Sequence, residues 1–389
     1  MTPGVQVVRL GLAMAAVLAC VGAGFHAFAG QAGDAPDLVS GPASSAESCV
    51  EVGWDMLRRG RHREAIRMFT AAKAHRRDDP RLFLGLGTAR YRLMEFGPAV
   101  SDLARALELN PHLEEAHTIL GAISFARDEL ASSIQHYEKA LTLNPNDVGI
   151  QDRLFAVRRA ADFEGTLQRQ NQPHFIVKHG SSHRDTATRV AERLEALYRR
   201  IGRQLDSFPA ERTIVILYAA DRFSRLTDTP GWAGGLFDGR IHLAVDAMNM
   251  SSKEVDASLA HEYAHALVHR LAGGHAPTWL EEGLALYFEG RDRAWSDEIL
   301  KSKDVDMIPL HALHESFLGF PPDHARIAYA ESYSATCALI ERYGLKEVRR
   351  LLESLAEVAD FTAAFETVLK SPYHEFESAW ALAERQRRL

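Results

Sequence analysis

Residues 261–265 read His-Glu-Tyr-Ala-His, and residues 277–285 read Pro-Thr-Trp-Leu-Glu-Glu-Gly-Leu-Ala. We predict that the first segment lies within a long helix that begins near residues 251–254, where a capping-box pattern stands. Pro277 and Thr278 are typical of a helix start after the Gly-Gly-His loop at 273–275. Both of these helices carry residue types that bind metals.

The spacing of the two histidines indicates a metal site. His261 and His265 stand at i and i+4, so their rings project from one helix face about 6 Å apart, and one Zn²⁺ can accept a nitrogen from each. Glu262 lies one step round the helix, where it could take a proton from a water on the metal without being a ligand. A third ligand is still required.

Two sources of a third ligand within the first helix fail. The extended motif H-E-x-x-H-x-x-G-x-x-H needs glycine and histidine where the sequence has Val268 and Leu271. His269 continues the i+4 series, but by that turn the helix has rotated too far for three rings to meet one ion. An acid on the second helix is the remaining solution, and Glu281 and Glu282 both lie in its first turn.

The two motifs together, H-E-x-x-H and W-L-x-E-G-x-A, resemble the gluzincin metallopeptidases of the peptidase MA-like group. Both halves match in order, with 16 residues between His265 and Glu282. The gap in the aminopeptidase branch is slightly longer, and the sequence shows no acid that would hold a substrate amine, so we do not expect an aminopeptidase. The resemblance implies that Glu282, directly before the glycine, is the ligand. Glu281 then takes the variable position, as an acid stabilised by the helix dipole.

The resemblance implies one Zn²⁺ per chain, with three protein ligands and an open fourth position for water. The ligands would be His261, His265 and Glu282, and Glu262 would be the catalytic base. The expected reaction is hydrolysis of peptide bonds.

The segments around this helix pair predict an α+β domain over residues 173–389 with a helical C-terminal part. Strands are expected at 174–177, 213–218 and 240–245, with a helix at 186–205, which gives a small mixed sheet flanked by helices. By resemblance, the Gly-rich segment 232–238 and the strand after it lie where zincins pair an edge strand with extended substrate.

The C-terminal part offers candidates that could stabilise a developing oxyanion, as a Tyr or His does in gluzincins. Tyr329 and Tyr333 lie on one face of a predicted helix, and Tyr333 is the favoured catalytic candidate. A tyrosine packed in the core is the alternative for each. His311, His314 and His324 are further candidates.

Residues 47–165 contain an internal repeat of period 34. Glycines recur at positions 53, 87 and 121, and the same shift relates apolar residues at 66, 100 and 134 and alanines at 72, 106 and 140. The order of Leu-Gly, aromatic, Ala and Asn-Pro resembles the tetratricopeptide (TPR) family, which implies three helical hairpins and a capping helix. Small residues are expected where the two helices of a repeat cross closely. The array either presents a concave surface to a protein partner or serves as an arm packed on the next domain.

The first 29 residues have the order of a secretory signal: Arg9, an uncharged apolar run, then Ala-Phe-Ala at 27–29. An uncleaved membrane anchor and a lipoprotein that carries its lipid on Cys20 remain open as alternatives. Residues 30–46 are expected to be a flexible linker. These features predict an exported protein of the periplasm, cell envelope or extracellular space.

Composition excludes several classes. The 389 residues carry 45 Lys and Arg against 52 Asp and Glu, a net charge of −7, which gives no basic excess for a nucleic-acid partner. Three cysteines cannot form a disulfide framework, and Cys49 and Cys337 are expected to be free thiols. Histidines 75, 112, 117 and 136 fall in the repeat array without metal-like spacing.

Two hypotheses follow. The first is a zinc-dependent endopeptidase of the cell envelope whose repeats bind or orient a protein substrate. The second is an envelope scaffold or assembly protein in which the repeats act and the zinc site is vestigial or structural.

Overall fold

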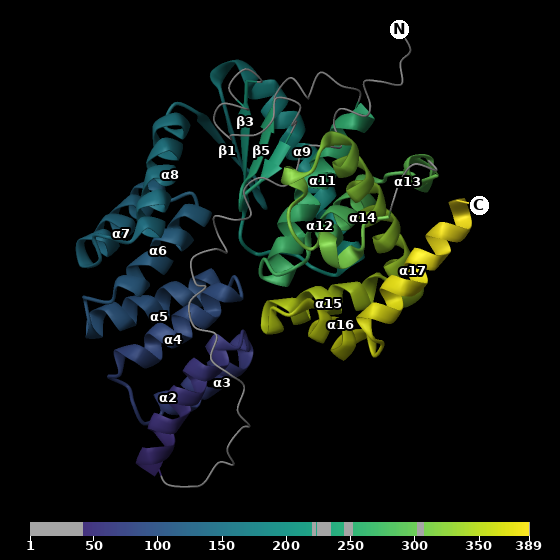
Figure 1. The fold of residues 1–389 in the computed structure, drawn as a ribbon. Coiled ribbons are helices and arrows are strands. Elements are labelled where there is room, and N and C mark those ends of the chain that lie inside the picture. The colour runs from purple at the N-terminus through teal and green to yellow at the C-terminus, as the bar shows by residue number, and fades with distance from the viewer. Residues whose placement is uncertain (1–41, 220–222, 224–234, 245–251, 302–306, 389) are drawn as a thin grey trace. The chain divides into compact units, whose positions relative to one another are not determined.

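The computed structural model describes residues 42–219, 223, 235–244, 252–301 and 307–388 (Figure 1). The chain divides at Gly165 and Thr166 into two compact units, and the short stretch Ala356–Val358 is grouped with the first. The predicted signal or anchor at 1–29, with Cys20, lies outside the described residues. None of the described helices is both long and apolar enough to cross a membrane.

The first unit is a series of helices that pair along the chain, followed by one more helix (Figure 1). Its elements are α2 (Pro42–Arg58), α3 (His62–Lys73), α4 (Pro80–Arg92), α5 (Phe96–Leu109), α6 (Glu114–Ala126), α7 (Leu130–Leu143) and α8 (Val148–Glu164). The pairs α2/α3, α4/α5 and α6/α7 are the three predicted repeats, and α8 is the predicted capping helix.

The repeated glycines lie where the two helices of each hairpin approach. A Cβ atom on Gly53 would lie 2.8 Å from the ring of Phe69, and one on Gly121 would lie 2.9 Å from the ring of Tyr137. Gly87 has the same relation to Leu103, at 2.5 Å from Cγ. The period-34 pattern therefore reflects close helix crossings, as expected.

The predicted domain limits differ from those of the structure. The array begins at Pro42, the first residue of α2, which lies within the predicted linker. Proline is common in the first turn of a helix. The second unit begins before residue 173, since the polar strand β1 (Gln168–Asn171) pairs with β2 (Phe175–His179). β1 is mostly exposed and has no apolar pattern by which the sequence could show it.

The second unit contains a five-stranded sheet of order β1-β2-β3-β5-β4. β2, β3 (Thr213–Tyr218) and β5 (Ile241–Ala244) run parallel, while β1 and β4 (Gly235–Phe237) are antiparallel edge strands. The three strands predicted from the sequence are all present. β4 lies next to β5 and forms one edge of the sheet. It falls within residues 232–238, which the sequence analysis described as a Gly-rich segment.

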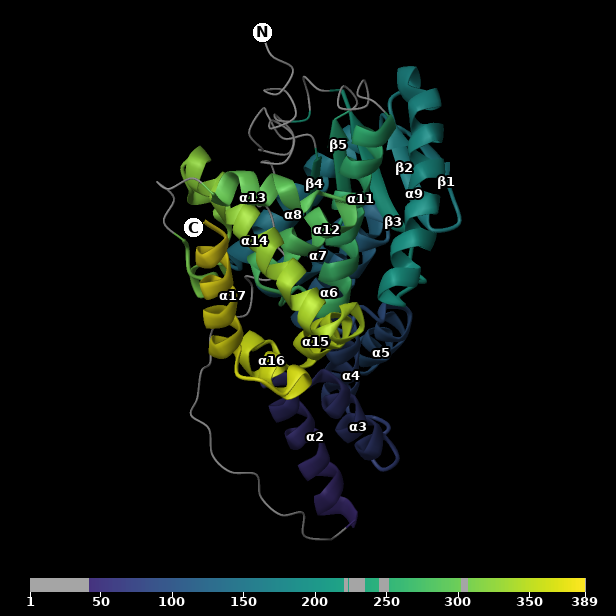
Figure 2. The same cartoon turned by 90° about the vertical axis from the view of Figure 1, so that its right-hand side faces the viewer.

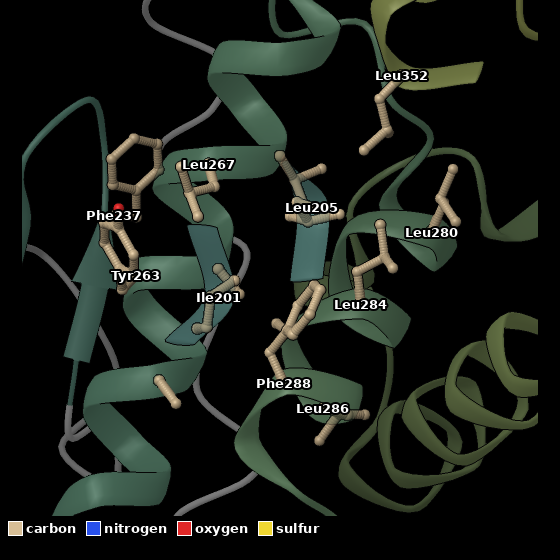
Figure 3. Packing of buried hydrophobic residues seen from close by; sticks show 14 of the residues in the cluster. Ile201, Leu205, Phe237, Tyr263, Leu267, Leu280, Leu284, Leu286, Phe288 and Leu352 are labelled. Carbon is tan, nitrogen blue, oxygen red and sulfur yellow. The ribbon is translucent and has the colours of Figure 1, made fainter. Parts of the chain in front are cut away.

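Two long helices, α9 (Arg184–Leu205) and α11 (Ser252–Ala272), lie side by side against the sheet (Figures 1 and 2). Ile201 and Leu205 of α9 lie among side chains of α11 and of α12 (Thr278–Glu289), including Leu267 and Leu284 (Figure 3). This continuous core fixes α11 and α12 relative to each other, and these are the two helices that carry the predicted ligands.

The remaining elements are helical, as predicted: α13 (Arg293–Leu300), α14 (Pro322–Tyr343), α15 (Leu345–Val358), α16 (Phe361–Leu369), α17 (Tyr373–Arg388) and the short 3-10 turns η3 (Ser181–His183), η5 (Leu310–Leu313) and η6 (Phe317–Gly319). Helix α14 packs against α12, with Gly283 facing Ser332 and Thr336. Cys49 and Cys337 are both free thiols, as expected.

Candidate metal centre

His261, His265 and Glu282 converge on one point in the buried interior. The Nε2 atoms of the two histidines lie 3.2 Å apart. Oε2 of Glu282 lies 3.5 Å from Nε2 of His265 and 3.7 Å from Nε2 of His261. One donor atom from each residue falls within 4.8 Å of the others, so the three predicted ligands form a cluster that could hold a metal ion.

The chemistry of this donor set fits Zn²⁺. Oε2 of Glu282 is buried without a hydrogen-bond donor, and an unpartnered buried carboxylate oxygen is costly unless a cation satisfies it. Zn²⁺ binds nitrogen and oxygen ligands at about 2.0–2.2 Å, so tetrahedral neighbours lie roughly 3.3–3.5 Å apart. The observed separations are close to that range, and two nitrogens with one carboxylate are a common catalytic zinc set.

The acidic surroundings of His265 favour a cation at this point. Burial by itself lowers the pKa of His265, but Glu282, Glu262 and Glu281 outweigh it and raise the pKa to about 9. The same negative field attracts a divalent ion.

Glu262 lies beside the cluster as a buried acid. Burial raises its pKa to about 7, with a further contribution from Glu282, while His261 and His265 oppose the rise. Its Oε2 atom has no hydrogen-bond partner. A carboxyl group with a pKa near neutrality can both accept and release a proton at physiological pH.

Gly235 of edge strand β4 contacts Glu262. A Cβ atom at position 235 would lie 2.7 Å from Cδ of Glu262 and closer still to Oε1. Only glycine therefore lets β4 approach the carboxylate. The sequence showed Gly235 as part of a Gly-rich turn and gave no sign of this contact.

Glu289 contacts His261 on the side of the ring opposite to the cluster. Its Oε2 lies 3.1 Å from Nδ1 of His261, and its Oε1 accepts a hydrogen bond from Arg291. A carboxylate on Nδ1 fixes the ring so that Nε2 keeps its lone pair. Sequence reasoning missed this residue, although Glu289 stands seven positions after Glu282 and so returns to the same face of α12.

His242 of β5 forms a second buried network near Glu262. Its Nε2 lies 2.9 Å from Oδ1 of Asp238, and its Nδ1 lies 2.8 Å from the hydroxyl of Tyr218. Burial would raise the pKa of Asp238, but His242 and Arg240 lower it below its usual value. His242 also lowers the pKa of Glu262. The alternation of β5 could have shown that His242 faces away from the core side chains of that strand.

Glu281 is buried and His269 is half-buried near the cluster, but neither is part of it. Burial raises the pKa of Glu281 to about 7. Burial lowers the pKa of His269 to about 4, and its ring packs edge-on against Phe237. His269 is therefore a half-buried residue whose ring is neutral at pH 7.

The oxyanion candidates are engaged elsewhere. The hydroxyl of Tyr333 donates to the carbonyl of Arg291, and Tyr329 packs edge-on against Phe317. His311 contacts Glu377, His314 contacts the hydroxyl of Tyr373, and His324 is exposed. None of these five joins the three-residue cluster, so the catalytic role of Tyr333 stays a prediction.

Comparison with known proteins agrees with this geometry. Residues 216–383 match the family model of the Peptidase MA superfamily. That region includes the three clustered residues, Glu262 and the helices that position them. The chain thus carries a Peptidase MA superfamily domain preceded by a TPR-like array.

The curated relatives resemble a shorter part of the chain. The peroxisomal targeting signal receptor of Kluyveromyces lactis is 41% identical over 70 residues, 18% of this chain and 12% of its own length. Human RNA polymerase II-associated protein 3 is 30% identical over 110 residues, 28% of this chain and 16% of its own. Hsp70-Hsp90 organizing protein 2 of Arabidopsis thaliana is 26% identical over 109 residues, 28% of this chain and 19% of its own. The chain therefore spans less than a fifth of each of these relatives.

A solved structure, the first TPR of Spaghetti (RPAP3) bound to the HSP90 peptide SRMEEVD, aligns with 31% of this chain and 95% of its own. The two are 28% identical in sequence, with a TM-score of 0.30.

Proposed function

We propose that the protein is a zinc-dependent metallopeptidase. The observation that carries this proposal is the buried Oε2 of Glu282, which has no hydrogen-bond donor and lies within 3.7 Å of two histidine nitrogens. The match of residues 216–383 to the Peptidase MA superfamily supports the same reading.

His261, His265 and Glu282 would hold the ion. When bound, Zn²⁺ supplies Lewis-acid activation of water and of the substrate carbonyl. Glu289 holds the ring of His261 in the orientation that binding needs.

Glu262 is the proposed base. Its carboxylate accepts the proton of the attacking water and can pass that proton to the leaving amine nitrogen. Because position 235 is a glycine, the carboxylate of Glu262 has room to lie beside strand β4.

The substrate is proposed to be an extended peptide cleaved within the chain. β4 is a terminal strand of the sheet, so its outer edge is not paired within the described strands. An extended peptide could add to that edge next to Glu262. We propose that the TPR-like array binds a protein substrate or partner, in line with the relatives whose names describe a receptor and protein organisers.

We also propose that the enzyme works outside the cytoplasm, in the cell envelope or as a secreted protein. This proposal rests on the signal-like order of residues 1–29. A cleaved signal, a membrane anchor and a lipid anchor at Cys20 are the three forms, which mass analysis of the mature N-terminus would distinguish.

The test uses the purified chain, elemental analysis and hydrolysis of casein and a peptide library. We expect at least one zinc per chain, and a loss of about 10²- to 10⁴-fold in kcat for Glu262→Gln with the metal retained. Glu298→Gln, an exposed acid on α13, is the matched control and should leave hydrolysis unchanged. Protein without zinc, or full activity in Glu262→Gln, would refute the proposal.

The envelope scaffold is the second candidate, favoured by a repeat array that fills most of residues 42–164. A scaffold would have no use for the buried, unpartnered Oε2 of Glu262, which costs stability. A cell carrying Glu262→Gln separates the two: a scaffold keeps its cellular role, while a peptidase loses it.

A further inference from the structure

His117 and His136 face each other within the third helical hairpin. His117 lies in the first turn of α6 and His136 lies on α7, 19 residues later. Their Nδ1 atoms are 3.1 Å apart, and the ring centroids are separated by 5.4 Å. Sequence spacing suggested no relation between these two residues, and the hairpin brings them together.

The packing of the repeats does not require histidines at these positions. When the sequence is shifted by one period of 34 residues, His117 aligns with Phe83 of the second repeat and His136 aligns with Asp102. There, Phe83 is a buried apolar residue and Asp102 pairs with Arg90. The third repeat is therefore the one whose hairpin presents two ring nitrogens to each other.

The ring of His117 has a second partner besides His136. The ring of His117 also hydrogen-bonds the backbone carbonyl of Pro111. A metal-binding histidine typically donates one ring N–H to such a carbonyl, which leaves the other nitrogen as a lone pair directed at the ion. The nitrogen of His117 that faces His136 is Nδ1.

The separation of the two nitrogens fits one ion. Nitrogens at about 2.0–2.1 Å from a tetrahedral Zn²⁺ lie roughly 3.3 Å apart. Burial lowers the pKa of both histidines, and for His117 the neighbouring His136 and Lys139 add to the effect. Both rings are therefore neutral near pH 7, the form that binds metal.

We propose that His117 and His136 form a second metal site, in the TPR-like array, for a divalent transition metal that prefers imidazole, such as Zn²⁺. Both rings are partly exposed, so water can complete the coordination. The positive charge of Lys139 opposes any cation, which selects against ions bound mainly by charge, such as Mg²⁺. The bound metal would link α6 to α7 and stabilise this hairpin.

The test counts zinc equivalents on the full chain by equilibrium dialysis with Zn²⁺ followed by elemental analysis. The wild-type chain should bind two equivalents, and His136→Gln should bind one. Glutamine can keep a hydrogen bond between the helices but is a far poorer ligand, so the change separates metal binding from a purely structural contact. His112→Gln, at an exposed histidine in the loop before α6, is the control and should retain two equivalents.

A second pair of variants makes the outcome independent of the peptidase site. In a His261→Gln/His265→Gln background one equivalent should remain, and adding His136→Gln should abolish it. If the wild-type chain and His136→Gln bind the same number of equivalents, the proposal is overturned, whatever happens to hydrolysis.

Lys139→Gln covers the case in which a histidine variant fails to fold, because Lys139 is exposed. Removing this charge should tighten the second zinc equivalent by about fivefold. An unchanged dissociation constant for that equivalent would place it elsewhere in the protein and overturn the assignment. Mg²⁺, used in parallel, should not compete.

Discussion

Nδ1 of His261 lies 3.1 Å from Oε2 of Glu289, the last residue of the helix that also carries Glu282. Helix α12 thus contributes to the metal centre twice, once through Glu282 and once through the acid that orients the ring of His261. The two acids are seven residues apart, or about two helical turns, so a single helix face presents both. Any shift of α12 against α11 would disturb both interactions together.

The first prediction concerns Glu289→Gln. The amide can still accept a hydrogen bond from His261 but lacks the negative charge that strengthens the ring as a ligand. We expect roughly 10- to 100-fold weaker zinc binding with little change in thermal stability. Competition with a chromophoric chelator measures the affinity. Glu298→Gln is again the control, and unchanged zinc affinity in Glu289→Gln would mean that this contact does not orient the ligand.

The second prediction concerns Gly235→Ala. The added methyl group would overlap the carboxylate of Glu262 and force either that side chain or strand β4 to move. Because a displaced base cannot reach the attacking water, we expect kcat to fall by at least about 10²-fold while zinc binding is retained. Steady-state hydrolysis together with zinc analysis separates the two effects.

The matched control is Gly319→Ala, because a Cβ atom there would meet nothing within 4 Å. It should hydrolyse peptides at the wild-type rate. Full activity in Gly235→Ala would show that Glu262 tolerates displacement, which the close approach of β4 argues against.

The features that sequence could predict are those with short-range or periodic signals. The pair His261 and His265 follows from the helical repeat, and the hairpins follow from glycines spaced by 34 residues. Helix geometry alone could not distinguish Glu282 from Glu281 as the third ligand. The resemblance to the W-L-x-E-G-x-A motif was needed to select Glu282. The structure brings Glu282, and not Glu281, into the cluster.

The features that sequence could not predict depend on contacts between distant segments. Gly235 lies 27 residues before Glu262, and Glu289 lies 28 residues after His261, so each contact joins two separate elements of the fold. His117 and His136 meet because a hairpin folds one helix back on the other. β1 escaped detection because its residues, Gln-Arg-Gln-Asn, are polar and mostly exposed.

The third prediction concerns the glycine of the second motif. Gly283 faces α14 so closely that a Cβ atom would lie 2.8 Å from Cβ of Thr336 and also overlap the carbonyl oxygen of Ser332. Gly283→Ala should therefore push α12 and α14 apart and destabilise the protein by about 1–3 kcal/mol. Chemical denaturation monitored by circular dichroism measures the change.

A second-site change tests this cause. Thr336→Ala removes the overlap with the hydroxyl of Thr336 but leaves the Cβ atom at position 336 and the backbone carbonyl of Ser332 in place. Combined with Gly283→Ala, it should restore part of the lost stability and not all of it. Full stability in Gly283→Ala alone would contradict the close packing of these helices.

The fourth prediction is the acid sensitivity caused by His269. Its pKa falls to about 4 in the folded chain, from an ordinary value of 6.5, because desolvation of the ring disfavours its charged form and His275 and His265 add to the effect. Between these two pH values the unfolded chain binds more protons at this position than the folded chain does. The contribution of His269 is therefore fully present above about pH 6.5 and is lost as the pH falls toward 4.

The substitution His269→Met isolates this effect, because methionine is apolar, adaptable in shape and carries no proton. Wild-type stability minus variant stability should fall by up to about 1.4 kcal/mol for each pH unit between 6.5 and 4. Urea denaturation at several pH values gives this difference, with all other titrating groups cancelling between the two proteins. His324→Met, at an exposed histidine, should show no such trend. A flat difference for His269→Met would mean that His269 takes up its proton as readily in the folded chain as in the unfolded one, and that its ring is not held neutral by burial against Phe237.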